Sequence, residues 1–133
     1  MEVDFAFLAD AAEVSNGKLY SIGGAFDTIY AKEVPVVHPA MSFALRLLLS
    51  PAELDRTHQL EVVLIDGDGK RLGGIGGEVN VSKKTGSPVG WRTGFLTAVP
   101  LYNLHFESFG DYAFEIVVNG TSMKSIPLRV ASR

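Results

Sequence analysis

The chain has 133 residues, with 12 lysines and arginines against 15 aspartates and glutamates, and it contains no cysteine. This is the length of one ordinary domain, which we place at residues 1–133, because two domains of half the size would each bury too small a core. The absence of cysteine excludes disulfides, zinc–thiolate sites and thiol nucleophiles, and the net charge of −3 means that the chain lacks the excess of positive charge typical of a nucleic-acid-binding protein.

The first predicted element is a strand over residues 3–14. Apolar and polar side chains alternate along it, which is typical of a half-buried strand and places Phe5 and Phe7 on the core side. Asn16-Gly17 follows and predicts a hairpin, because both central residues of the favoured turn need positive φ.

The return strand of this hairpin is predicted over residues 18–30. Gly23-Gly24 interrupts it, which indicates a bulge or the close approach of another backbone. Residues 34–39 contain two prolines and are therefore not expected in a central strand. Met41 to Leu49 is the best candidate for one, because alternate residues are large and apolar. Ser50-Pro51-Ala52-Glu53 then predicts one short helical turn that begins with a capping box.

The second half of the chain is also predicted to form strands, at residues 58–66, 70–81, 91–99, 111–118 and 121–130. Four glycines in the second of these strands indicate that it is twisted, bulged or at a sheet edge. Asn119-Gly120 predicts a second hairpin. Pro127 favours an edge position for the last strand, since proline cannot donate to a ladder of hydrogen bonds.

These elements predict an all-β fold, a single antiparallel β-sandwich that is immunoglobulin-like or related, with about eight strands and one short helical turn. The expected core consists of Phe5, Phe7, Phe43, Leu45, Leu47, Val62, Leu64, Phe95, Tyr112, Phe114 and Ile116.

Residues 109–116, FGDYAFEI, resemble the end of immunoglobulin-like sandwiches. In those proteins a tyrosine stands two residues before a core position and its hydroxyl bonds back to the backbone of the corner. The resemblance implies that Phe114 occupies the core position usually held by cysteine. The chain also resembles a family of small uncharacterised bacterial proteins. The resemblance lies in the opening DFAFLADAAEV, the stretch LYSIGGAFDTI and the ending GDYAFEIVVNG with IPLRV. This second resemblance implies a compact β-sandwich and no known activity.

The sequence shows no catalytic, cofactor-binding or metal-ligating constellation, and we expect no cofactor. Residues 66–70, DGDGK, resemble the start of a calcium loop, but lysine stands where the fifth position needs a ligand, so a plain turn is favoured. Residues 73–77, GGIGG, lack the following helix that a phosphate cradle needs. His38, His58 and His105 share no ligand spacing.

No targeting segment is evident. Acidic residues stand in the opening MEVDFAFLAD where a secretory signal needs basic and apolar residues, and Arg46 interrupts the most apolar stretch. We therefore expect a cytoplasmic protein that binds neither membrane nor nucleic acid.

The segment from residue 100 to residue 109 is apolar but does not alternate cleanly. It either covers the open end of the sandwich or exposes an apolar patch to a partner. Under the second alternative, the interaction surface consists of Pro100, Leu101, Tyr102, Leu104, Phe106 and Phe109.

The leading hypothesis for function is a non-catalytic protein-interaction or assembly module, which pairs with a protein partner or with copies of itself. One alternative is a small-ligand-binding protein or hydrolase with a site at one end of the sandwich, drawing on His38, His58, His105, Asp66 or Asp68. Another is a structural component of a larger particle, for which sandwiches are common scaffolds.

Overall fold

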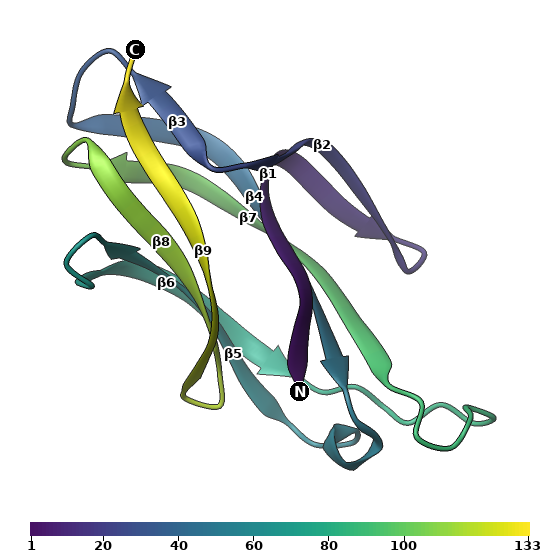
Figure 1. Cartoon of the computed structure of the whole chain (residues 1–133). Helices are drawn as coiled ribbons and strands as arrows, with labels where there is room; N and C mark the ends of the chain where they lie inside the picture. The colour runs from purple at the N-terminus through teal and green to yellow at the C-terminus, as the bar shows by residue number, and fades with distance from the viewer.

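The computed structural model describes all residues, Met1–Arg133, and consists of two β-sheets packed face to face (Figure 1). The strands are β1 (Glu2–Ser15), β2 (Lys18–Phe26), β3 (Thr28–Ala31), β4 (Val36–Leu49), β5 (His58–Asp66), β6 (Arg71–Val79), β7 (Thr93–Phe106), β8 (Gly110–Val118) and β9 (Thr121–Ser132). The one helix is a 3₁₀ turn, η1, at Pro51–Glu53. The predicted all-β sandwich is confirmed.

One sheet has four strands in the order β2-β1-β4-β7, and the other has five in the order β3-β9-β8-β5-β6. All neighbours are antiparallel except β3 and β9, which are parallel. The glycine-rich strand β6 lies at a sheet edge, as predicted. The structure has no helix that is both long enough and apolar enough to cross a membrane.

Both predicted hairpins are present. Asn16 and Gly17 have φ of 51° and 72°, and Asn119 and Gly120 have φ of 50° and 81°. These positive values are the ones that a two-residue turn between twisted strands requires, and asparagine and glycine tolerate them best.

The prediction of one return strand over residues 18–30 was wrong, because the chain changes sheets at Asp27. β2 belongs to the four-stranded sheet and β3 to the five-stranded sheet. This change of sheet follows a bulge, which was predicted at Gly23-Gly24. Leu8 of β1 pairs with Phe26, but the next residue of β1 pairs with Gly24. Ala25 is the extra residue, with a φ of 64°. A bulge bends its strand, and here it directs the chain toward the other sheet.

The core lies between the two sheets, and two aromatic contacts cross it. The ring of Phe43 on β4 packs against that of Phe114 on β8, with centroids 5.6 Å apart. Phe106 and Tyr112 meet edge to face at 4.9 Å. The Tyr112 hydroxyl donates to the carbonyl oxygen of Ser108 at 2.7 Å.

The assignment of Phe5 and Phe7 to the core was wrong. The register between β1 and β4 shifts just before Phe5, so Asp4 is an extra residue. Beyond this shift, Ala6 and Leu8 face the core, and the two phenylalanines lie on the outer face of the sheet, half-buried. Because side chains alternate with a period of two, one extra residue moves every later side chain to the opposite face.

Two predictions that rested on proline were also wrong. Of residues 34–39, the last four form the start of the central strand β4, and β9, which contains Pro127, lies between two strands. In both cases the proline lies in a part of its strand that has a neighbouring strand on one side only. β1 pairs with β4 only from Ser42 onward, and β3 pairs with β9 only from Arg129 onward. Each strand is therefore an edge locally, where a missing N–H breaks no ladder.

The short turn η1 anchors the start of β1. Glu53 accepts hydrogen bonds from the backbone N–H and the hydroxyl of Ser50, both at 2.9 Å, and pairs with the ammonium group of Met1 at 2.7 Å. Burial raises the pKa of Glu53, but these hydrogen bonds outweigh it and lower the pKa from 4.5 to about 2. The predicted capping role of Glu53 is therefore extended by an ion pair to the N-terminus.

Candidate interaction surface

The side of the four-stranded sheet that faces away from the other sheet is built mostly from apolar residues. Residues paired directly across antiparallel strands point to the same side, so the register assigns each residue to a face. We call this side the apolar outer face. It includes Phe5, Phe7, Ala9, Ala11, Tyr20, Ile22, Gly24, Ala40, Ser42, Ala44, Leu96, Ala98, Pro100 and Tyr102.

The centre of the apolar outer face is closely packed. The rings of Phe5 and Phe7 stack with centroids 5.9 Å apart and an interplanar angle of 26°. The ring of Phe7 also covers Gly24, where a Cβ would lie 3.1 Å from Cε2. Ala9 and Ala44 are completely buried although they lie outside the sandwich core. The small residues therefore let larger neighbours lie flat against the sheet.

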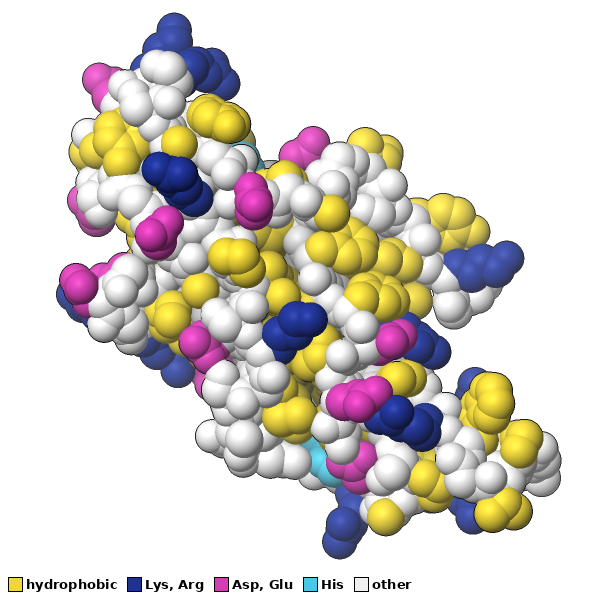
Figure 2. Space-filling model, in the orientation of Figure 1, with side chains coloured by type: hydrophobic (Ala, Val, Ile, Leu, Met, Phe, Trp, Pro, Cys, Tyr) yellow, Lys and Arg dark blue, Asp and Glu magenta, His cyan; other side chains and the backbone are white.

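The face continues onto the β1–β2 hairpin, which projects from the body of the sandwich (Figure 1). Ile22 and Tyr20 on this hairpin are 74% and 55% exposed, and Tyr102 on β7 is 67% exposed. Figure 2 shows hydrophobic side chains gathered over the hairpin. Large apolar groups are thus presented to solvent on an extended arm.

The outer face of the five-stranded sheet is different. It mixes apolar positions, which are Val63, Ile65, Ala113, Val117 and Pro127, with polar and charged ones, which include Gln59, Glu61, Arg71, Glu78, Asp111, Glu115, Ser125 and Arg129. Arg71 pairs there with Glu61 at 2.6 Å. A sheet face in water ordinarily has this character, so the two outer faces of the molecule are chemically unequal.

Most charges on the apolar outer face are concentrated near one end, where they pair with each other; Glu13, opposite Tyr20, lies at the other end, on the β1–β2 hairpin. Arg46 binds Asp4 at 2.5 Å and its guanidinium lies over Gly94, while Arg92 binds Glu2 at 2.8 Å. The hydrogen bond from Arg92 lowers the pKa of Glu2, and the same bond raises the pKa of Arg92. The two pairs contribute no net charge to this end of the face.

The residues predicted to form an interaction surface separate into two groups. Pro100 and Tyr102 lie on the apolar outer face, and Phe109, 40% exposed, lies in the turn before β8. Leu101 and Phe106 are buried in the core, and Leu104 packs against it. Residues 100–106 form the end of β7, and their alternation breaks at Asn103, which has a φ of 51°. Pro100 and Tyr102 before this break face outward, whereas Leu104 and Phe106 after it face the core.

Two of the residues considered for a small-ligand or hydrolase site, His58 and Asp66, make hydrogen bonds within the fold. His58 is buried, with Nε2 2.8 Å from a carbonyl oxygen of η1 and Nδ1 3.0 Å from the Asn119 amide nitrogen. Asp66 accepts the backbone N–H groups of Asp68 at 3.0 Å and Lys70 at 2.9 Å, which confirms the plain-turn interpretation. No three His, Asp or Glu side chains lie close enough together to hold a metal ion.

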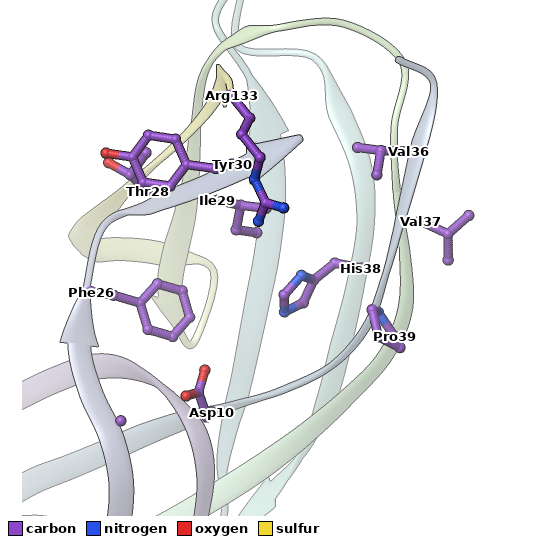
Figure 3. Close-up of a pocket in the computed structure, with 11 residues that line it drawn as sticks. Asp10, Phe26, Thr28, Ile29, Tyr30, Val36, Val37, His38, Pro39 and Arg133 are labelled. Carbon is purple, nitrogen blue, oxygen red and sulfur yellow. The ribbon is translucent and has the colours of Figure 1, made fainter. Parts of the chain in front are cut away.

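One histidine does share a concave site with a carboxylate. A cavity of about 560 Å³ lies where the chain passes from β2 to β3, and Asp10, His38 and Arg133 line it (Figure 3). The sequence did not suggest this combination, because the three residues come from distant segments. His105 lines a different, mainly apolar cavity of about 270 Å³ between β6 and β7.

No curated protein sequence matches the chain. Among solved structures, the alkylpurine DNA glycosylase AlkC of Pseudomonas fluorescens, bound to DNA containing an abasic site analog, matches 78% of this chain with a TM-score of 0.46 and 10% identity. A glycosyl hydrolase family 2 member from Bacteroides cellulosilyticus matches 73% with a TM-score of 0.38 and 10% identity. The chain spans 27% and 14% of those two proteins. A family model matches residues 4–131, and the chain belongs to this family of unknown function, DUF6941.

Proposed function

We propose that this protein is a non-catalytic interaction and assembly module that binds a partner protein through the apolar outer face. The observation that carries the proposal is the inequality of the two outer faces. The outer face of the five-stranded sheet has charged residues spread among its apolar ones, whereas the four-stranded sheet presents the large apolar side chains of Phe5, Phe7, Ile22 and Tyr102. Contiguous exposed apolar surface of this kind marks a protein interaction site.

We propose a second copy of the chain as the partner, and the sheet edges favour this choice. Edge strands are usually protected by proline, charge or short length. β7 carries Pro100, β3 has four residues, and β6 carries charges at both ends. β2 has nine residues, no proline and no acidic residue, and its one charge is Lys18 at the start. The bulge at Ala25 interrupts the end of β2, so residues 18–22 at its start form the least protected edge of the molecule.

A two-fold arrangement would use this edge and the apolar outer face together. Antiparallel pairing of β2 with β2 of the second copy joins two four-stranded sheets into one sheet of eight. The exposed side chains of Tyr20 and Ile22 then lie beside those of the partner copy. Residues 18–22 suit such pairing, because their register against β1 is regular.

Oligomeric state tests this proposal. We expect light scattering after gel filtration to give the mass of a dimer for the wild-type chain and of a monomer for Ile22→Lys. Met123→Lys is the matched control, since Met123 is also exposed but lies on β9 of the other sheet. It should leave the dimer intact. A wild-type protein that stays monomeric at high concentration would exclude the second copy as the partner.

We also infer that the sandwich is immunoglobulin-like in arrangement. The bond from Tyr112 to the Ser108 carbonyl supports this inference, and so does Phe114, which packs across the sheets two residues later. The inference concerns fold alone and assigns no function by itself.

A further inference from the structure

The cavity at the β2–β3 crossover brings together three polar groups that have no ionic partner within the protein. Asp10 projects from β1, His38 from β4 and Arg133 from the segment after β9 (Figure 3). The four ion pairs of the structure involve none of them. A site with unpaired charges of both signs suits a ligand that also carries both signs.

The charges are not gathered at one point of the cavity. Figure 3 shows the Arg133 guanidinium and the Asp10 carboxylate apart from each other, with Ile29 and His38 near the arginine and Phe26 to one side. The cavity thus offers apolar surface as well as groups that carry charge of both signs. The volume of about 560 Å³ is in the range of small-molecule sites.

The Asp10 carboxylate lies directly against the backbone beside the cavity. Gly23 has a φ of 64°, and a Cβ at this position would overlap Oδ2 of Asp10 and lie 2.8 Å from Cγ. With any other residue at position 23, the carboxylate would have to move from the place it occupies here. Ala25, two residues later, also has a φ of 64°, which is unfavourable for a residue with a Cβ. Strained backbone is often retained where it positions a binding group.

We propose that this cavity binds a small extended zwitterion, with a carboxylate at one end, an ammonium group at the other and methylene groups between them. This is the chemistry of an ω-amino acid. The carboxylate binds Arg133 and His38, the ammonium group binds Asp10, and the methylenes lie against Phe26 and Ile29. A ligand with one charge would leave part of the site unpaired. The site is separate from the apolar outer face, and this proposal does not depend on the proposed function.

The test is an NMR titration of the full chain with 6-aminohexanoate, with hexanoate and hexylamine as analogues that each lack one charge. We expect saturable shifts at the backbone amides of residues that line the cavity. Each analogue should bind about tenfold or more weakly, because it loses one charge-assisted interaction. Equal binding by an analogue, or no saturable shift with 6-aminohexanoate, would overturn the proposal.

Variants locate the interaction. Asp10→Asn and Arg133→Gln should each weaken binding of 6-aminohexanoate by about tenfold or more. Glu13→Gln and Arg129→Gln are matched controls, since both residues are exposed and neither lines the cavity. Spectra of the free variants report that they are folded. Unchanged binding in both cavity variants would contradict the assignment even if the wild type binds the probe.

Discussion

The phenyl rings of Phe43 and Phe114 contact each other across the two sheets, with centroids 5.6 Å apart and planes inclined at 56°. Both side chains are buried, with exposed fractions of 0% and 2%. The pair connects the central strand β4 of one sheet to β8 of the other. In a chain without cysteine, packing has to provide this connection.

Phe114→Ala should therefore cost about 3–5 kcal/mol in the free energy of unfolding, because it removes a ring and leaves a cavity. Chemical denaturation measures this loss. Phe5→Ala is the matched control, since Phe5 is half-buried on the outer face. It should cost clearly less. A loss below about 1 kcal/mol for Phe114→Ala would show that the ring contributes little to the core.

Tyr112→Phe should cost about 1 kcal/mol, because it removes the hydrogen bond from the hydroxyl to the Ser108 carbonyl while the ring stays in place. Thermal or chemical unfolding would detect the difference. Tyr30→Phe is a suitable comparison, since Tyr30 is 60% exposed, and it should be nearly neutral. Equal effects of the two substitutions would argue against a stabilising role for the corner bond.

The lowered pKa of Glu53 predicts a pH dependence of stability. The pKa is about 2 in the folded chain against 4.5 for a free group, so the unfolded chain binds the proton more readily between these values. The stabilisation by Glu53 is present above about pH 5 and is lost as the pH falls toward 2. We expect a loss on the order of 2 kcal/mol.

Glu53→Gln should remove this part of the pH dependence. Glu33→Gln, at an exposed position, should retain it. Unfolding free energies measured from pH 6 to pH 2 would compare the two variants. If the curves of wild type and Glu53→Gln are parallel over this range, the ion pair between Glu53 and the Met1 ammonium group does not stabilise the fold.

Gly23→Ala should destabilise the chain and displace the Asp10 carboxylate, because a Cβ at this position overlaps it and φ is positive. We expect a cost of at least about 1 kcal/mol. Gly77→Ala is the comparison, since Gly77 has open space around its Cβ position. It should be tolerated. If Gly23→Ala is neutral, the Asp10 carboxylate is not held by this close approach.

The parts of the fold that depend on local sequence were predictable. Asn16-Gly17 set the first turn, and the alternation around Tyr112 and Phe114 placed both side chains in the core. The outer face was not predictable, because one extra residue, Asp4, reverses the orientation of Phe5 and everything after it. No alternation pattern shows such a shift without knowledge of the partner strand.

The cavity escaped prediction for a different reason. Asp10, His38 and Arg133 are far apart in the chain and meet only because the chain changes sheets at Asp27. That change depends on the bulge at Ala25, and the glycine pair indicated the bulge but not the direction of the following strand. A site assembled by topology is readable only once the strand order is known.

Cross-linking of a single introduced cysteine tests most directly whether the apolar outer face joins two copies. The chain has no cysteine of its own, so Ser21→Cys on β2 places one thiol at the proposed edge. A short bismaleimide should link this variant into a covalent dimer at low protein concentration, whereas Ser125→Cys on β9 should remain monomeric. Equal and slow cross-linking of the two variants, as expected from random collision, would contradict pairing through β2.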